Sequence, residues 1–164
     1  MSGSWVIEVI ETRDSEQGDY ETRDNFEMTD LVTEHNGGQV ICATSFDALH
    51  PPELVIDGSD HTFWSSTGMF PQEFIVKLGS TAQVTRIKTL TTNVKSMVVE
   101  RCEGVAPISW EKVFDMECPD TDGRLQVESS QVSKITANFL KFKFVSGWDE
   151  FVTVHRVQVE GKTR

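Results

Sequence analysis

The sequence predicts an all-β fold: an antiparallel β-sandwich or jelly roll of about eight to nine strands that begins near residue 28. Short stretches of apolar or alternating residues recur along this part of the chain, and turn-forming residues separate them. No window has the sustained 3.6-residue apolar repeat that is typical of an amphipathic helix. The expected strands span residues 39–44, 73–78, 84–90, 97–101, 110–116, 124–127, 139–145 and 151–159.

Two of these stretches show the alternation of a half-buried strand especially well. In residues 139–145, Lys141 and Lys143 fall on one face and aromatic residues on the other, and residues 152–159 alternate in the same way. The spacing of short strands and turns favours an antiparallel sandwich. The turn signals between strands are Asn36-Gly37-Gly38, Asp57-Gly58, Gly79-Ser80, Asp122-Gly123 and Gly147.

The first 27 residues have a different composition. They carry eight acids and two arginines, a net charge of −6, whereas the whole chain of 164 residues has a net charge of −11. Residues 12–26 lack the apolar content needed to offset the entropy of ordering, so we predict a disordered acidic leader over 1–27 and a folded domain over 28–164. Apolar and polar residues alternate weakly in residues 5–10. This pattern suits a flexible leader or, alternatively, a docking peptide or a loosely added strand.

Charge and cysteine content narrow the possible partners. An acidic protein repels nucleic-acid phosphates and anionic membrane surfaces, so we expect no nucleic-acid partner and no direct membrane insertion. No apolar run approaches the length of a membrane span, and Glu8 and Glu11 interrupt any signal-peptide core, which favours a cytoplasmic protein. The three widely spaced cysteines suggest reduced thiols.

No sequence feature indicates catalysis. The four histidines lack the spacing of metal ligands, and neither a nucleophile elbow nor a phosphate-binding loop is present. We therefore predict that the protein is not an enzyme. Trp64 suits either a core aromatic residue under a loop or, alternatively, a platform on which a sugar could stack.

Residues 43–78 carry the most distinctive pattern in the chain. Ala-Thr-Ser is followed by Pro-Pro-Glu, then Ile-Asp-Gly-x-x-x-Thr-x-Trp, then Thr-Gly-Met-Phe-Pro-Gln-Glu-Phe. Together with Val-His-Arg-Val and Glu-Gly near the C-terminus, this pattern resembles the intraflagellar transport protein 25 family, also called heat-shock-like protein beta-11. The resemblance covers residues 31–161 and implies a galactose-binding-like, discoidin-type jelly roll.

The Asp-Gly segment within this pattern is a candidate calcium site. Calcium binds six to eight oxygen atoms, and Asp57 and Thr62 offer a carboxylate and a hydroxyl around the sharp turn at Gly58. The alternative is an Asx-type turn that these two residues close by hydrogen bonds alone. The resemblance implies structural Ca²⁺ held also by the carbonyl groups of Leu54 and Ser59 and by Glu160 from the last strand.

Large apolar residues next to the expected loops are candidate contacts for a protein partner. These residues are Met69, Phe70, Trp148 and Phe151. Aromatic residues and methionine are enriched at the centres of interfaces, although each of the four could instead fold inward.

The resemblance implies a biological role for such a surface. It implies a non-catalytic subunit of the intraflagellar transport B complex that forms a heterodimer with a Rab-like small GTPase subunit and acts in the cytoplasm and the cilium or flagellum. A discoidin-type carbohydrate-binding module is the alternative, and a small heat-shock chaperone is suggested only by the older family name.

Overall fold

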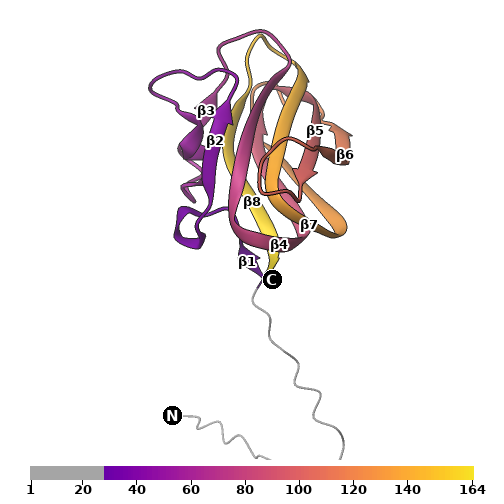
Figure 1. Cartoon of the computed structure of the whole chain (residues 1–164). Helices are drawn as coiled ribbons and strands as arrows, with labels where there is room; N and C mark the ends of the chain where they lie inside the picture. The colour runs from indigo at the N-terminus through magenta and orange to yellow at the C-terminus, as the bar shows by residue number, and fades with distance from the viewer. Residues whose placement is uncertain (1–27) are drawn as a thin grey trace, which may run out of the picture.

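The computed structural model describes residues 28–164, which form a two-layered β structure (Figure 1). The prediction of an all-β antiparallel jelly roll is confirmed. The predicted leader, residues 1–27, lies outside the described residues. The elements are β1 (Thr29–Asp30), η1 (Glu34–Asn36), β2 (Gln39–Ala43), η2 (Pro52–Ile56), β3 (Trp64–Ser65), β4 (Gln72–Thr92), β5 (Val94–Cys102), β6 (Glu111–Glu117), β7 (Gln126–Gly147) and β8 (Thr153–Thr163).

Two long strands, β4 and β7, run through both layers and pair with each other along most of their length. The sheet order is β1-β8-β4-β7-β5-β6, with β2 paired to the first part of β4 and β3 paired to β8. All of these pairs are antiparallel. The second half of β4 therefore lies between β8 and the first half of β7, and the second half of β7 lies between β4 and β5.

The prediction that residues 73–78 and 84–90 form two strands separated by a turn is wrong. Gly79 and Ser80 lie inside β4, where the pairing with β7 is interrupted between Lys77 and Ala82 and then resumes. Similarly, β7 includes both predicted segments, 124–127 and 139–145, apart from the first two residues. A bend within a strand uses the same small residues as a turn, because both need a local departure from the regular pleat.

Alternate residues from both layers point into a shared apolar core. Trp64, Phe74, Phe142 and Phe144 are fully buried, with the Trp64 and Phe74 ring centroids 5.3 Å apart and those of Phe74 and Phe142 5.2 Å apart. The indole N–H of Trp64 donates to the carbonyl of Ser45 at 2.8 Å, which satisfies its polar atom. Trp64 is thus a core residue, and the alternative of a sugar-stacking platform is wrong.

Gly161 allows close packing where β1, β4 and β8 meet. A Cβ atom at this position would lie 2.0 Å from the carbonyl oxygen of Gln83 and 2.9 Å from Cδ1 of Leu31. Only a residue without a side chain fits there. Within residues 28–164, no helix has the length and apolar character required to cross a membrane.

Candidate functional site

The predicted partner-binding residues lie on two neighbouring loops. Met69 and Phe70 belong to the loop between β3 and β4, and Trp148 and Phe151 belong to the loop between β7 and β8. Met69 is 87% exposed, whereas Trp148 and Phe151 are 43% and 46% exposed. Phe70 is half-buried and packs against the core. We call these four residues the apolar loop surface.

Direct contacts hold the two loops together. Ser66 donates its backbone N–H to the carbonyl of Val152 at 3.1 Å, and the backbone N–H of Val152 donates to Oγ of Ser66 at 3.0 Å. A Cβ atom on Gly147 would lie 2.5 Å from Cζ of Phe70, so the absence of a side chain lets the Phe70 ring lie against the backbone of the second loop. The structure thus brings the predicted residues of both loops to one end of the sandwich.

Buried polar contacts fix the backbone beside Met69. Gln72 is buried, donates to the carbonyl of Met69 at 2.7 Å and accepts a hydrogen bond from Ser45 Oγ at 2.6 Å. Oγ of Ser45 in turn accepts the backbone N–H of Thr67 at 3.0 Å. Since the backbone on both sides of this loop is tied down, the exposed Met69 side chain is presented from a fixed position.

Trp148 is also held in place although its ring is partly exposed. Its indole N–H donates to the carbonyl of Cys118 at 2.9 Å, and its backbone N–H donates to the carbonyl of Asn93 at 2.8 Å. Lys95 Nζ lies 4.8 Å from the ring centroid. Burial of the Cys118 thiol, reinforced by the negative charge of Glu128, raises the pKa of Cys118 to about 11. The two hydrogen bonds of Trp148 fix the indole before a partner binds, so the ring is pre-organised for binding.

Two further exposed apolar residues were not predicted from the sequence. Phe46 and Leu49, in the segment between β2 and η2, are 52% and 82% exposed. Ser45, next to Phe46, contacts Thr67 as described above, so this segment adjoins the Met69 loop. Polar and apolar residues do not alternate in this segment, so no sequence pattern predicted that these two side chains would be exposed.

The loop half of the predicted calcium site is assembled around Asp57. One carboxylate oxygen accepts the backbone N–H of Ser59 at 2.9 Å, and the other accepts the hydroxyl of Thr62 at 2.5 Å. Gly58 has a φ of +80°, which allows the chain to turn sharply here. This geometry is also that of an Asx-type turn, so it does not distinguish the two alternatives.

Glu160 makes its side-chain contacts elsewhere. Its carboxylate pairs with Lys88 Nζ at 2.7 Å and with Arg86 Nε at 3.8 Å, both on β4. The side chains of β8 that contact the Asp-Gly loop are His155, whose Nδ1 lies 2.9 Å from the carbonyl oxygen of Asp60, and Arg156, 3.4 Å from its carboxylate. Among residues 28–164, no group of three or more His, Cys, Asp or Glu residues could hold a metal. Calcium binding stays a prediction.

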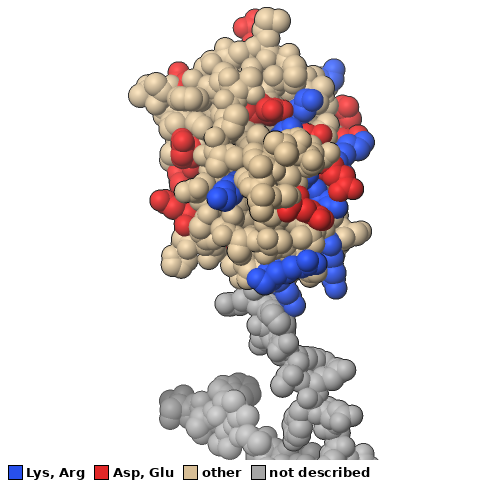
Figure 2. All heavy atoms as spheres, viewed as in Figure 1, with Lys and Arg blue, Asp and Glu red and all other residues tan. Residues whose placement is uncertain are grey.

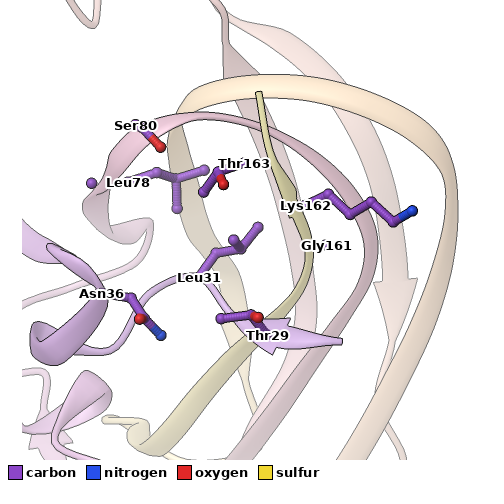
Figure 3. Close-up of a pocket in the computed structure, with 9 residues that line it drawn as sticks. Thr29, Leu31, Asn36, Leu78, Ser80, Gly161, Lys162 and Thr163 are labelled. Carbon is purple, nitrogen blue, oxygen red and sulfur yellow. The ribbon is translucent and has the colours of Figure 1, made fainter. Parts of the chain in front are cut away.

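One aromatic cluster lies beside this loop. His50 and Phe63 are stacked with centroids 4.0 Å apart, and Phe63 lies 5.0 Å from His155. Phe63 and His155 border an open depression near Asp60 and Arg124. A second hollow lies where β1 meets the end of β8, and Lys162 is the one titratable residue among those that line it (Figure 3). The others are Thr29, Leu31, Asn36, Leu78, Gly79, Ser80, Gly161 and Thr163. Neither arrangement offers a nucleophile and a base in contact.

Comparisons with known proteins agree with this architecture. The model of the F5/8 type C domain family matches residues 39–157. Intraflagellar transport protein 25 of Chlamydomonas reinhardtii is 47% identical over 134 residues, which cover 82% of this chain and 70% of that protein. The Homo sapiens homolog of intraflagellar transport protein 25 is 38% identical over 132 residues, which cover 80% of this chain and 92% of that protein.

Solved structures are similar in fold. Chitosan-binding module 1 from a chitosanase/glucanase of Paenibacillus sp. IK-5 has a TM-score of 0.69 at 22% identity and covers 80% of this chain and 98% of its own. The family 32 carbohydrate-binding module of Clostridium perfringens NanJ, solved with galactose, has a TM-score of 0.68 at 18% identity and covers 80% of this chain and 98% of its own. At these identities the likeness concerns the fold alone.

Proposed function

The chain belongs to the intraflagellar transport protein 25 family, and from that premise we propose that it is a non-catalytic subunit of the intraflagellar transport B complex that binds a Rab-like small GTPase subunit. Its relatives are named as transport proteins and its fold is that of a binding module, which agrees with a role in intraflagellar transport at the cilium or flagellum. Two points of the proposal go beyond membership of the family, namely the Rab-like GTPase partner and a place in the B complex.

The apolar loop surface is the observation that supports a protein partner. Its exposed side chains come from two loops that are hydrogen-bonded to each other, and the indole of Trp148 is fixed by a hydrogen bond of its own. Fixed aromatic residues and methionine on a rigid support are typical of binding hot spots, because little conformational entropy is lost on association.

The proposal is tested by titrating the full chain with the Rab-like GTPase subunit from the same organism in a calorimeter. We expect a one-to-one complex with a submicromolar dissociation constant, as is usual for a stable heterodimer. Absence of binding when the GTPase carries either GDP or GTP would refute the proposed partner. A glycan array run in parallel tests the alternative of a carbohydrate-binding module, for which the buried Trp64 offers no platform.

A structural calcium ion is a second proposal. Asp57 and Thr62, with the carbonyl groups of Leu54 and Ser59, supply oxygen atoms of the kind that calcium prefers. The ion would stiffen the loop after η2 and takes no part in any reaction. For Glu160 to be a ligand, its carboxylate would have to leave Lys88.

Thermal unfolding with and without calcium tests this site. We expect added calcium to raise the melting temperature of the natural chain and to leave that of Asp57→Ala unchanged. Equal shifts in both proteins would argue for the Asx turn alone. Glu160→Gln tests whether Glu160 is a ligand in addition to the oxygen atoms of the Asp57 loop. If the loop alone binds calcium, this variant should keep the full calcium-dependent rise in melting temperature.

A further inference from the structure

A hollow of about 230 Å³ lies on the outer face of the sheet made by β8, β4 and the first part of β7. Leu90 of β4 is paired with Arg156 of β8 on one side and with Val127 of β7 on the other, and all three line the hollow. Val157, the next residue of β8, is buried in the core, so its neighbours point outward. Asp60 closes one side of the hollow from the Asp-Gly loop.

Arg156 has more hydrogen-bond donors than its contacts use. Its Nη1 donates to Oδ1 of Asp60 at 3.4 Å, which is longer than an ordinary N–H···O bond. Its Nε is buried and has no hydrogen-bond partner among residues 28–164. Buried N–H groups in proteins are nearly always paired, and a guanidinium presents its donors in a planar fork. The side chain therefore has unused capacity for a planar anion.

Two further polar side chains line the hollow next to Arg156. Lys88 of β4 and Gln158 of β8 are paired in the register of these strands, so they lie side by side. Nζ of Lys88 lies 2.7 Å from the carboxylate of Glu160, and an ammonium group with three donors has room for a second acceptor. The amide of Gln158 adds two donors.

The hollow differs in charge from the chain as a whole. The chain has a net charge of −11, and Figure 2 shows Asp and Glu side chains interspersed with Lys and Arg over one face of the domain. Around the hollow, three cations meet two carboxylates, which leaves a local excess of positive charge. These groups are Arg86, Lys88, Arg156, Asp60 and Glu160. Exposed charges more than about 10 Å away are largely screened, so a small anion would respond mainly to this local set.

We propose that this hollow binds a short aliphatic carboxylate, about the size of a glutamate side chain. The carboxylate matches the planar fork of Arg156, with Lys88 beside it. Leu90 and Val127, which is 75% exposed, form an apolar wall for the alkyl part of the ligand. A free organic acid and a glutamate side chain of a protein partner share this chemistry. The proposal depends neither on the GTPase partner nor on calcium.

NMR titration of the full chain with sodium butyrate tests the proposal, with sodium chloride used to hold the ionic strength constant. We expect saturable shifts of the amides of residues 88–90, 127 and 156–158 and of the Nε–H of Arg156. The dissociation constant should be about 1–10 mM, as is usual for a ligand of this size. Butyramide has nearly the same shape without the charge and should produce no saturable shift.

Val127→Asp is the most direct variant. It places a carboxylate at the mouth of the hollow, so butyrate should bind at least about tenfold more weakly. The exposure of Val127 makes the substitution compatible with folding. Val105→Asp is the matched control, because Val105 is fully exposed in the loop between β5 and β6 and does not line the hollow. It makes the same change in net charge and should leave the affinity for butyrate as in the natural chain.

Arg156→Lys tests the planar fork separately from the charge. Lysine keeps the positive charge but lacks the planar set of donors, so this variant should also bind butyrate more weakly than the natural chain. The loss of the Arg156 Nε–H signal in this variant also assigns that signal in the natural chain.

Repeating the titration on the heterodimer with the GTPase subunit distinguishes the two sources of the carboxylate. If a side chain of the GTPase supplies it, the butyrate shifts should disappear in the heterodimer and Val127→Asp should weaken the heterodimer. If a free acid is the ligand, butyrate should bind the free chain and the heterodimer alike. Shifts that grow linearly with butyrate, equal shifts with butyramide, or equal affinities of Val127→Asp and Val105→Asp would each overturn the proposal.

Discussion

Replacing Trp148 by alanine should weaken binding of the GTPase subunit by about 30-fold while the domain stays folded. A Trp side chain buries about 150–250 Å² in an interface. Since Trp148 is 43% exposed, about 65–110 Å² of that surface is free to be covered by a partner. At about 25 cal/mol per Å², the loss is about 2 kcal/mol, which corresponds to about a 30-fold higher dissociation constant.

The same substitution should cost stability without unfolding the chain. The covered part of the ring and the hydrogen bond to the Cys118 carbonyl together contribute about 3–4 kcal/mol. Because a domain of ordinary stability has about 5–15 kcal/mol, Trp148→Ala should keep a cooperative but lower thermal transition, which circular dichroism measures. Met69→Ala gives a second variant whose effect on stability is small, since Met69 is 87% exposed.

Trp110→Ala is the matched control for the binding measurement. Trp110 precedes β6 and packs under Lys141, whose Nζ lies 4.1 Å from the ring centroid. This substitution removes a Trp side chain from a different surface. Calorimetry should therefore give the same dissociation constant for Trp110→Ala as for the natural chain. If Trp148→Ala and Met69→Ala both bind within twofold of the natural chain, the apolar loop surface is not the interface and the reasoning from exposure fails.

Three further outcomes are expected. At pH 8 an aromatic disulfide reagent should label the exposed Cys42 rapidly and Cys118 only on unfolding, because burial raises the pKa of Cys118 to about 11. Gly161→Ala should lower the melting temperature by several degrees or abolish folding, because the new methyl group would overlap the β4 backbone. Burial raises the pKa of Asp30 above 3.8, so its ionisation opposes folding; Asp30→Asn, which keeps the acceptor oxygen, should leave stability at pH 7 equal or higher in urea titrations. As the pH rises from 3.8 through the raised pKa of Asp30, the natural chain should also become less stable relative to Asp30→Asn. A relative loss of stability as the pH falls through this range would contradict the sign.

The strand content could be predicted from the sequence because alternation is a local signal. Residues 139–145 fall in β7 and residues 153–159 fall in β8, as expected. The continuity of β4 and β7 could not be predicted, because whether Gly79-Ser80 turns the chain back or only bends it depends on pairing with β7 on both sides of the bend. The two-residue strands β1 and β3 were missed for a similar reason, since each exists only through its pairing with β8.

The exposure of Met69 and Trp148 could be predicted from the sequence more easily than the contacts of the Asp-Gly loop. Met69 lies between the expected strands 39–44 and 73–78, and Trp148 follows the turn signal at Gly147. Large apolar residues outside expected strands stand out in a sequence. The contribution of the last strand to the Asp-Gly loop depends instead on strand register. The pairing of β8 with β4 shifts between Leu90 and Thr91, opposite Arg156 and Val154.

This shift explains why β8 contacts the Asp-Gly loop through adjacent residues. In a regular strand, His155 and Arg156 would point to opposite faces, yet both are half-buried and both contact Asp60. Beyond the irregularity, regular alternation resumes and places Glu160 opposite Arg86 of β4, where its carboxylate also meets Lys88. The loop is thus tied to β8 at Asp60 by two side chains of the protein itself. A calcium ion at Asp57 would consequently stiffen one turn of a loop that is already anchored, and it should leave the apolar loop surface, which other loops form, unchanged.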